Sequence, residues 1–278
     1  MSNSDLQKKA AQIRLDALMS IHKAGAGSSG SVMSVIEILV SLYYGEILGK
    51  SVMNFDSKKP QWEAQDYLFL SKGQAVPAQY AILADLGFFD KSELNFLGQI
   101  NSMLQPRPNA KVPGVAASTI SNGHGLSVAL GVALALKMDR KNNKIFAVLG
   151  DGELQSGQVW EAAMAASHYK LSNLIAFIDN NKVQAGGNVC SVMNIDPIQD
   201  KFESFGWNVI QVTNGHDFDQ ILDAVSRAFT SNRKPVCIWC HTVAGRGIDF
   251  AEGKPGYQGV ALSESEMSEV ISKLKDLK

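Results

Sequence analysis

The chain has 278 residues, of which 45% are hydrophobic, so it is long enough to bury a substantial core. Its 26 Lys and Arg residues nearly balance 27 Asp and Glu residues, which argues against nucleic acid or an acidic surface as a partner. The polar N-terminus lacks an apolar signal core and no window is long enough to span a membrane, so we expect a cytoplasmic protein without a membrane partner.

Helical and strand patterns alternate along the chain. The predicted helices cover residues 4–23, 32–47, the segment that follows Gln74 through Tyr80 to Leu86, 126–138, 156–169, 197–205, 217 (or 219)–229 and the tail from 263. The predicted strands cover 67–70, 144–149, 173–178, 207–212 and 235–239. Such alternation is typical of α/β proteins. We therefore expect a doubly wound, mainly parallel sheet flanked by helices, in a single domain over residues 1–278.

The three cysteines of the chain do not form a disulfide framework. Cys237 and Cys240 have the spacing of a redox CxxC motif, but they lie in a predicted strand, where positions three apart face opposite sides. We therefore expect neither a redox role nor a metal role for this pair.

The most informative stretch runs from Lys144 to Gly187. An apolar strand stops at Gly150-Asp151-Gly152, a helix follows, and a second buried strand ends in Asp179-Asn180-Asn181. A strand–helix–strand unit crosses over right-handed, so the two strands are parallel and both polar ends lie at one edge of the sheet. Ligands of open α/β sheets bind at that edge.

Asp151 and Asn181 project from these neighbouring strand ends. A carboxylate, an amide oxygen and a backbone carbonyl are hard oxygen ligands that suit Mg²⁺, which completes its shell with phosphates and water. Gly152 lets the backbone approach a phosphate, and the following helix offers free N–H groups. The stretch therefore predicts a metal-bridged diphosphate. The simpler alternative is that Asp151 and Asn181 serve only in turns and caps.

A spacing of 27 residues, 153–179, separates the GDG tripeptide from Asn180-Asn181. This combination resembles the thiamine diphosphate signature, and the segment WEAAMAASHYKLSNLIAFIDNNKVQAGG is similar to transketolases, most of all to the N-terminal half of the split, two-gene kind. The resemblance runs from Ile13 to about Ala261. It implies thiamine diphosphate as cofactor, bound with Mg²⁺ or with Ca²⁺ or Mn²⁺ in its place. The implied metal ligands are Asp151, Asn181 and the carbonyl of Val183, and the other implied cofactor-binding residues are Gln74, Ile120, Asn122, Gly150 and Gly152, whose N–H would meet the diphosphate.

The same resemblance implies one half of an enzyme. In the family, a pyrimidine-binding domain follows the present one. That domain contains the glutamate that activates the cofactor and most of the groups that bind the sugar phosphate. We expect the chain alone to be inactive on its small-molecule substrate. We also expect it to pair with a separate C-terminal subunit in an α2β2 assembly.

Several positions depart from the family pattern. Transketolases line their substrate channel with histidines, and local alignment places Ser28, Gln74, Arg107 and Gln258 where four of them are expected. Serine and glutamine only form hydrogen bonds and arginine stays charged, whereas histidine exchanges a proton near neutral pH. This pattern indicates retained thiamine chemistry with a changed donor or acceptor. Ser28 and Arg107 are candidate substrate-binding residues, although an arginine on a proline-rich loop is often solvent-exposed.

Gln74, Gln258, Glu161 and His124 are the candidate catalytic residues. Gln74 and Gln258 can still donate hydrogen bonds to the diphosphate or the substrate. Glu161 is kept from the cofactor motif of the family, in which Ser156 replaces another glutamate. His124 is introduced by this sequence, and it serves either in acid–base chemistry beside the cofactor or as a buried, hydrogen-bonded histidine.

Three functions are compatible with this pattern. The first is a transketolase subunit that moves a two-carbon ketol unit between sugar phosphates. The second is a transketolase-like acyl or acyloin transferase with another donor, such as a 2-oxo acid, in specialised metabolism. The third is a non-catalytic subunit that binds cofactor and partner only to stabilise an assembly.

Overall fold

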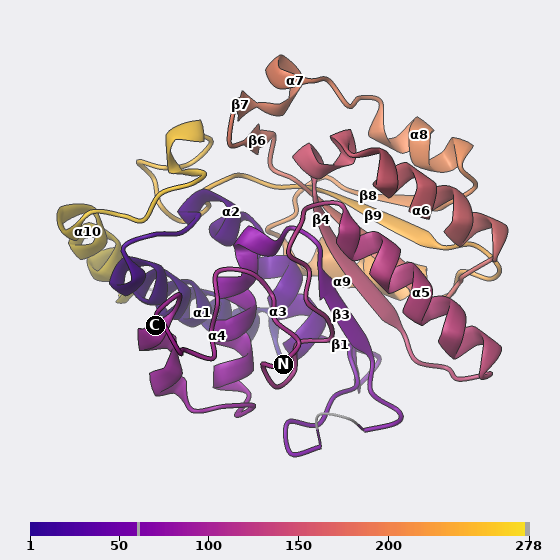
Figure 1. Ribbon diagram of the computed structural model, residues 1–278, viewed down its shortest axis with the longest axis horizontal. Coiled ribbons are helices and arrows are strands. Elements are labelled where there is room, and N and C mark those ends of the chain that lie inside the picture. Colours follow the sequence, from indigo (N-terminus) through magenta and orange to yellow (C-terminus); the bar gives the residue numbers. More distant parts are fainter. Residues whose placement is uncertain (60–61, 276–278) are drawn as a thin grey trace.

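A parallel sheet of five strands forms the centre of the protein, whose computed structural model describes residues 1–59 and 62–275 (Figure 1). The strands lie in the order β3–β4–β5–β9–β8, and every neighbouring pair is parallel. They are β3 (Tyr67–Leu70), β4 (Ile145–Gly150), β5 (Leu174–Asn180), β8 (Asn208–Val212) and β9 (Val236–His241). Each lies within two residues of its predicted ends, because short apolar runs bounded by polar residues determine buried strands well.

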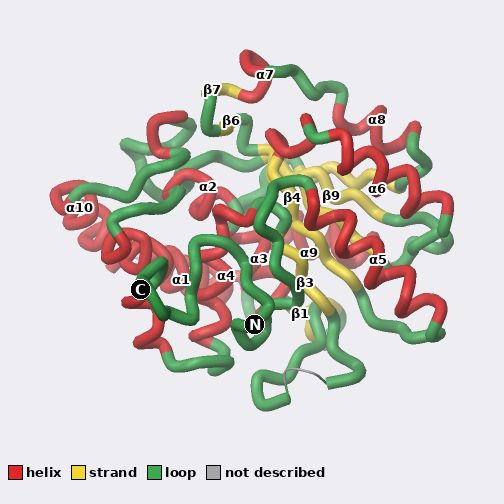
Figure 2. Tube along the Cα trace, in the orientation of Figure 1, coloured by secondary structure: helices red, strands yellow, loops and turns green. Residues whose placement is uncertain are grey.

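Helices cover both faces of this sheet (Figure 2). Side chains alternate along a strand, so Phe146 and Val148 of β4 enter one buried cluster while Ala147 and Leu149 enter the other. The first cluster contains residues of α1 (Asn3–Ala24), α2 (Ser29–Ser34), α3 (Ile36–Tyr44), α4 (Val76–Asp85), α9 (Phe218–Phe229) and α10 (Glu264–Lys275), and the second contains residues of α5 (His124–Met138), α6 (Gly157–His168) and α8 (Ile198–Ser204). The predicted doubly wound α/β fold is thereby confirmed.

The same alternation separates two cysteines of β9. Cys237 belongs to one buried cluster and Cys240 to the other, so the prediction that they face opposite sides is confirmed. Burial raises the pKa of both thiols well above the usual range. Both side chains therefore act as small apolar groups of the core.

Shorter elements connect the layers. They are the strand pairs β1 (Glu46–Ile47) with β2 (Lys50–Ser51) and β6 (Val183–Gln184) with β7 (Gly187–Asn188), the short helix α7 (Val189–Val192), and the 3₁₀ helices η1 (Gly73–Ala75), η2 (Lys91–Phe96), η3 (Asp151–Gln155) and η4 (Pro255–Tyr257). None of the helices among the described residues is long and apolar enough to cross a membrane. That residues 1–278 make up a single domain stays a prediction.

Two predicted helices differ from the observed ones. The first helix begins at Asn3 because Ser2 caps it: the hydroxyl accepts from the Asp5 N–H at 3.2 Å and the Asp5 carboxylate accepts from the Ser2 N–H at 3.0 Å. The helix predicted over residues 32–47 is divided at Val35 into α2 and α3. Beside this break, the Ser34 hydroxyl donates to the Asp179 carboxylate at 2.6 Å, a contact with the sheet that helical periodicity does not predict.

The chain leaves β3 and β4 toward opposite faces of the sheet. After β3 it continues into α4, which packs in the first cluster, whereas after β4 it continues into α6, which packs in the second. Neighbouring parallel strands with connections on opposite faces leave a crevice at their carboxyl ends, which is the usual ligand position in open α/β sheets. The fold therefore places a candidate site at the tips of β3, β4 and β5.

Candidate functional site at the carboxyl edge of the sheet

A cavity of about 320 Å³ lies at this crevice. Its walls come from the segments that follow β3, β4 and β5, from the start of α2 and from the loop after η4. Many of the residues predicted from the sequence line it together: Ser28, Gln74, Arg107, Asn122, Gly150, Asp151, Gly152, Asn181, Val183 and Gln258.

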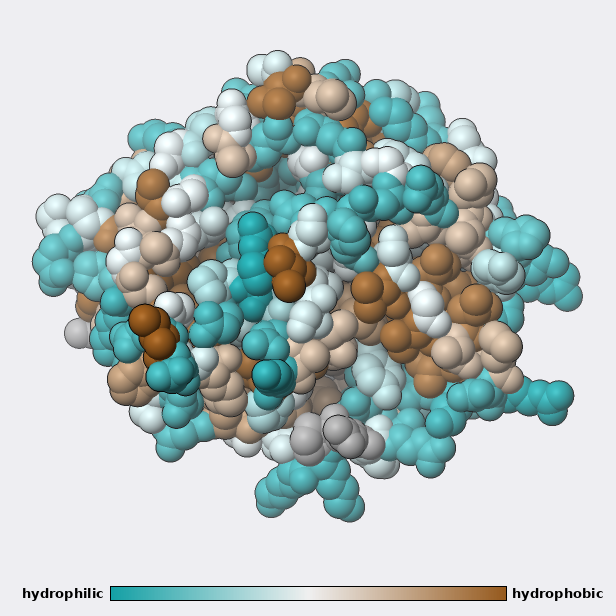
Figure 3. Space-filling model, in the orientation of Figure 1, coloured by the Kyte–Doolittle hydropathy of each residue, from teal (hydrophilic) through white to brown (hydrophobic). Residues whose placement is uncertain are grey.

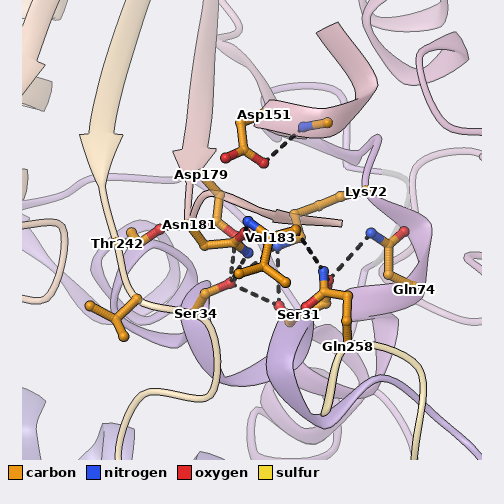
Figure 4. A network of polar contacts seen from close by, with 12 residues as sticks. Ser31, Ser34, Lys72, Gln74, Asp151, Asp179, Asn181, Val183, Thr242 and Gln258 are labelled. Atoms are coloured by element: carbon orange, nitrogen blue, oxygen red, sulfur yellow. Dashed lines mark hydrogen bonds and ion pairs between the residues drawn. The ribbon is translucent and has the colours of Figure 1, made fainter. Parts of the chain in front are cut away.

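The carboxyl ends of β4 and β5 lie side by side and are joined by hydrogen bonds. Gly150 of β4 pairs with Asp179 of β5, and the Lys182 N–H, one residue beyond Asn181, donates to the Asp151 carboxylate at 2.6 Å. Asp151 and Asn181 therefore lie at adjoining strand ends, as the strand–helix–strand argument predicts. Figure 4 shows both side chains in the same network of polar contacts.

The amide of Asn181 is held in one orientation. Its nitrogen donates to the Ser34 hydroxyl at 3.0 Å, and its oxygen accepts from the Val183 N–H at 3.0 Å. The Val183 carbonyl accepts from the Gln258 side-chain amide at 3.1 Å. The amide oxygen and the backbone carbonyl thus belong to one loop that lines the cavity.

Asp151 is buried, and Lys72, the charged group that lowers its pKa, is paired with Asp179. Burial and, next, the nearby Asp179 carboxylate raise the pKa of Asp151 to about 7. The Asn180 amide has hydrogen-bond partners for both its nitrogen and its oxygen in only one orientation. In that orientation its nitrogen donates to the Asp151 carboxylate at 3.0 Å, and its oxygen accepts from the Trp239 indole N–H at 2.9 Å. An ionised carboxylate at this depth is costly, and a divalent cation would offset that cost.

The oxygen set of Asp151, Asn181 and the Val183 carbonyl fits Mg²⁺, because hard cations prefer carboxylate, amide and carbonyl oxygens. No cluster of three or more His, Cys, Asp or Glu side chains suited to a metal occurs within residues 1–59 and 62–275. That finding is compatible with the set, since only one of its three members is a carboxylate.

The turn after β4 differs in detail from the sequence prediction. The Gly152 N–H donates to the Asp151 carboxylate at 2.8 Å, and the 3₁₀ helix η3, which the sequence did not predict, lies between this turn and the predicted helix over residues 156–169. Helix α6 begins only at Gly157. The φ angle of Gly152 is not positive, and a Cβ atom there would lie 2.7 Å from the Gln184 Oε1 atom, so a larger residue would displace the Gln184 side chain.

The four positions where the family has histidines face one cavity, although they come from separate segments. Arg107 donates from Nη1 to Gln74 Oε1 at 2.9 Å and to Asn122 Oδ1 at 3.2 Å. Gln258 donates to the Ser31 hydroxyl at 2.8 Å. Arg107 is half-buried and forms no ion pair with a carboxylate of the described residues. It therefore brings an unneutralised positive charge into the cavity.

Three predicted residues do not line the cavity. Ile120 is 72% exposed, His124 is exposed at the start of α5, and Glu161 is exposed on α6. The His124 ring contacts the Gln158 side-chain amide at 2.8 Å, so it is not the buried histidine of the structural alternative. Ile120 precedes α5, His124 begins that helix, and Glu161 lies on the exposed side of α6.

Sequence reasoning gave no role to two buried charged groups of this site. Glu153 lines the cavity, neither of its carboxylate oxygens has a hydrogen-bond partner, and burial raises its pKa to about 8. Lys72 is 1% exposed and forms an ion pair with Asp179. The available signal was their position, since Lys72 follows β3 and Glu153 follows β4, both at the ligand-binding edge.

Comparisons with known proteins agree with this geometry. Residues 6–275 match the family described as "Transketolase, thiamine diphosphate binding domain". The chain is 38% identical over 272 residues to 6-deoxy-6-sulfo-D-fructose transketolase subunit SqwG of Clostridium sp. (strain MSTE9), which covers 98% of this chain and 96% of the relative. It is 36% identical over 262 residues to an apulose-4-phosphate transketolase subunit of Phocaeicola vulgatus, covering 92% of this chain and 91% of that relative.

Solved structures match over the same length. A transketolase of Pichia stipitis in complex with fructose-6-phosphate superposes with a TM-score of 0.91 at 27% identity, covering 99% of this chain and 41% of that one. A transketolase from Leishmania mexicana gives a TM-score of 0.91 at 26% identity, covering 99% and 42%. The present chain thus spans about two fifths of these solved chains.

Proposed function

We propose a function from the premise that this chain belongs to the transketolase family, as its thiamine diphosphate-binding part. The family resemblance predicted from the sequence is confirmed by this membership. The chain acts as one subunit of a two-subunit, thiamine diphosphate-dependent transketolase that transfers a two-carbon ketol unit between sugar phosphates. The observation that carries the proposal is that the buried Asp151 lies beside the end of β5, which Asn181 follows, in a cavity at the carboxyl edge of the sheet.

The cofactor site is the part of this proposal that the geometry supports best. Mg²⁺ would be held by Asp151, Asn181 and the Val183 carbonyl, and Gly150, Gly152, Gln74 and Asn122 would surround the diphosphate. Bound thiamine diphosphate supplies the carbanion chemistry of the reaction. The residues of this chain hold the charged end of the cofactor and exclude water from it. The assignment of metal and ligands to individual residues stays a prediction.

The substrate end of the cavity is assigned to Ser28, Gln74, Arg107 and Gln258. The Arg107 guanidinium has further N–H donors besides those bound to Gln74 and Asn122, and such a fork binds carboxylate or phosphate well. Gln74 and Gln258 donate hydrogen bonds without exchanging protons. These side chains favour an anionic substrate that they bind and orient.

A partner subunit completes the proposed enzyme. The relatives matched along nearly their whole length are named as transketolase subunits, and full transketolase chains extend well beyond the part matched here. Apolar side chains also gather over α5 on the face shown in Figure 3, where Val128 is 37% and Met138 is 74% exposed. Exposed apolar patches often mark protein interfaces. The exposed Ile120, His124 and Glu161 would then act at a partner-covered surface. Their roles, the α2β2 stoichiometry and a cytoplasmic location stay predictions.

One observation favours a second candidate donor. Arg107 is a cation without a carboxylate partner where the family has a histidine, and a 2-oxo acid would supply that carboxylate. The chain would then belong to a transketolase-like acyl or acyloin transferase.

Reconstitution tests these functions. The chain is mixed with a candidate C-terminal subunit, thiamine diphosphate and Mg²⁺, and consumption of xylulose 5-phosphate or pyruvate is followed, with the two separate subunits as controls. Xylulose 5-phosphate turnover only by the mixture supports the proposal, and pyruvate turnover supports the second candidate. Turnover by the chain alone at a comparable rate would contradict the two-subunit proposal. Cofactor binding without turnover of any donor would favour a non-catalytic subunit.

A further inference from the structure

Asp179 is the centre of a buried polar cluster beneath the strand tips (Figure 4). Its carboxylate accepts hydrogen bonds from Lys72, from Ser34 at 2.6 Å and from Thr242, and the Asn181 amide nitrogen lies 3.5 Å away. These donors come from the segment after β3, from α2 and from the segment after β9. The cluster therefore joins three parts of the fold to the end of β5.

Ser34 connects this cluster to the site. Its hydroxyl donates to Asp179 and accepts from the Asn181 amide nitrogen at 3.0 Å. If the Asn181 amide were turned over, its nitrogen would face the Val183 N–H, and its oxygen would face the Asp179 carboxylate. Two donors would then meet at one end and two acceptors at the other. The surroundings therefore permit one orientation, in which the amide oxygen belongs to the loop that lines the cavity.

Lys72 fixes the place of Ser34 relative to Asn181. Its ammonium group pairs with Asp179, donates to the Ser31 carbonyl at 3.1 Å and lies 3.3 Å from the Ser34 hydroxyl. Because Ser31 and Ser34 both belong to α2, this one side chain ties α2 to the ends of β3 and β5. All three side chains, of Lys72, Asp179 and Ser34, are inaccessible to solvent or nearly so.

We propose that Ser34, held in place by Asp179 and Lys72, is a positioning residue that presents the Asn181 amide oxygen to the divalent cation of the cofactor. This inference rests on the proposed function and deepens it, because it assigns a role to side chains behind the ligand set. Side chains that bond to metal ligands orient them, and removing such a partner typically weakens metal affinity about 10- to 100-fold.

The test is the Ser34→Ala variant of the full chain, with metal affinity as the readout. Chelator-treated protein is titrated with Mg²⁺, and separately with Ca²⁺, in the presence of thiamine diphosphate, and binding is measured by calorimetry. We expect the variant to lose about 10-fold in Mg²⁺ affinity. We expect a loss of less than about 3-fold for Ca²⁺, since Ca²⁺ accepts irregular geometry whereas Mg²⁺ requires a near-ideal octahedron. Ser34→Cys, with a weaker acceptor, should fall between wild type and Ser34→Ala.

Ser20→Ala is the matched control. Ser20 is also a buried serine, its hydroxyl donates to the Leu94 carbonyl at 2.7 Å, and neither residue lines the cavity. This variant should lose similar stability and keep both metal affinities. Wild-type affinity in Ser34→Ala, an equal loss for both metals, or the same loss in Ser20→Ala would overturn the positioning role. Failure of the wild-type chain to bind thiamine diphosphate with either metal, both alone and in the mixture with the partner subunit, would instead contradict the proposed function, and the inference with it.

Discussion

Two groups of buried carboxylates in this protein have opposite surroundings. Glu37 of α3 is bonded on both oxygens, to Arg14 and to His216 at 2.9 Å, and Arg14 together with His216 lowers the pKa of Glu37 to about 2 despite its burial. At the strand tips, burial raises the pKa of Asp151 to about 7 and that of Glu153 to about 8.

This difference in surroundings distinguishes a carboxylate with a structural role, Glu37, from the carboxylates of the candidate binding site, Asp151 and Glu153. The cluster of Arg14, Glu37 and His216 is complete within the chain, since Arg14 also donates to the Arg246 carbonyl and His216 also accepts from the Val243 N–H. The Glu153 oxygens have no hydrogen-bond partner, and Asp151 has only uncharged donors. The nearby Lys72 is paired with Asp179, and its charge lowers the pKa of both carboxyls less than burial raises it. A buried carboxylate that the fold leaves uncompensated indicates a ligand that supplies positive charge.

The largest effect should come from breaking the complete cluster. Glu37→Gln leaves the Arg14 charge buried without its partner, and we expect the free energy of unfolding to fall by about 3–5 kcal/mol. Denaturant unfolding of the variant measures this loss. Because the cluster does not line the cavity, thiamine diphosphate affinity of the folded variant should match wild type. A variant as stable as wild type would show that the pair contributes nothing net.

Asp151→Asn should have the opposite effects, a loss of cofactor affinity without a loss of stability. It removes a ligand charge, so we expect metal-dependent thiamine diphosphate affinity to fall by at least about 100-fold, more than for an indirect partner. Without cofactor, the variant should be as stable as wild type or more stable, since position 151 then holds no carboxylate that is ionised in a buried place. Calorimetric binding and thermal unfolding measure the two quantities. Unchanged binding would remove Asp151 from the metal site.

The smallest effect is a difference in pH dependence. A carboxyl whose folded-state pKa is raised stabilises the fold at low pH, and that stability is lost as pH rises through the folded-state pKa. For Asp151 and Glu153 of the cofactor-free chain, this window lies between about pH 4 and pH 8. Glu37 has a lowered pKa, so its contribution is present above about pH 4.5 and is lost as pH falls through about 2.

Thermal unfolding at several pH values, with and without Mg²⁺ and thiamine diphosphate, measures this dependence. We expect wild type to lose on the order of 1–2 kcal/mol between about pH 5 and pH 7 relative to Asp151→Asn when cofactor is absent. Bound cation should reduce that loss. Parallel pH profiles for wild type and Asp151→Asn would contradict the raised pKa.

Local pattern and strand chirality were enough to bring Asp151 and Asn181 together. Both lie directly after buried strands joined by one helix, and such a unit places the strand ends side by side whatever the rest of the chain does. The strand ends and the opposite facing of Cys237 and Cys240 followed from the same kind of information, whereas the family came from the resemblance of the segment after β4 to transketolases. The outward position of Glu161 did not, because a kept motif residue says nothing about which surface covers it.

The sequence by itself determined the parallel sheet and the oxygen atoms at its edge that we propose as metal ligands, since short apolar runs, turn glycines and crossover handedness are local properties. Only the tertiary structure decided which charges meet behind those ligands. Lys72 and Asp179 are 107 positions apart, and Ser34 and Asp179 are 145 apart. Contacts over such separations depend on how helices pack on the sheet, and hydrophobic periodicity defines the face that a helix buries but not the particular side chain that it meets.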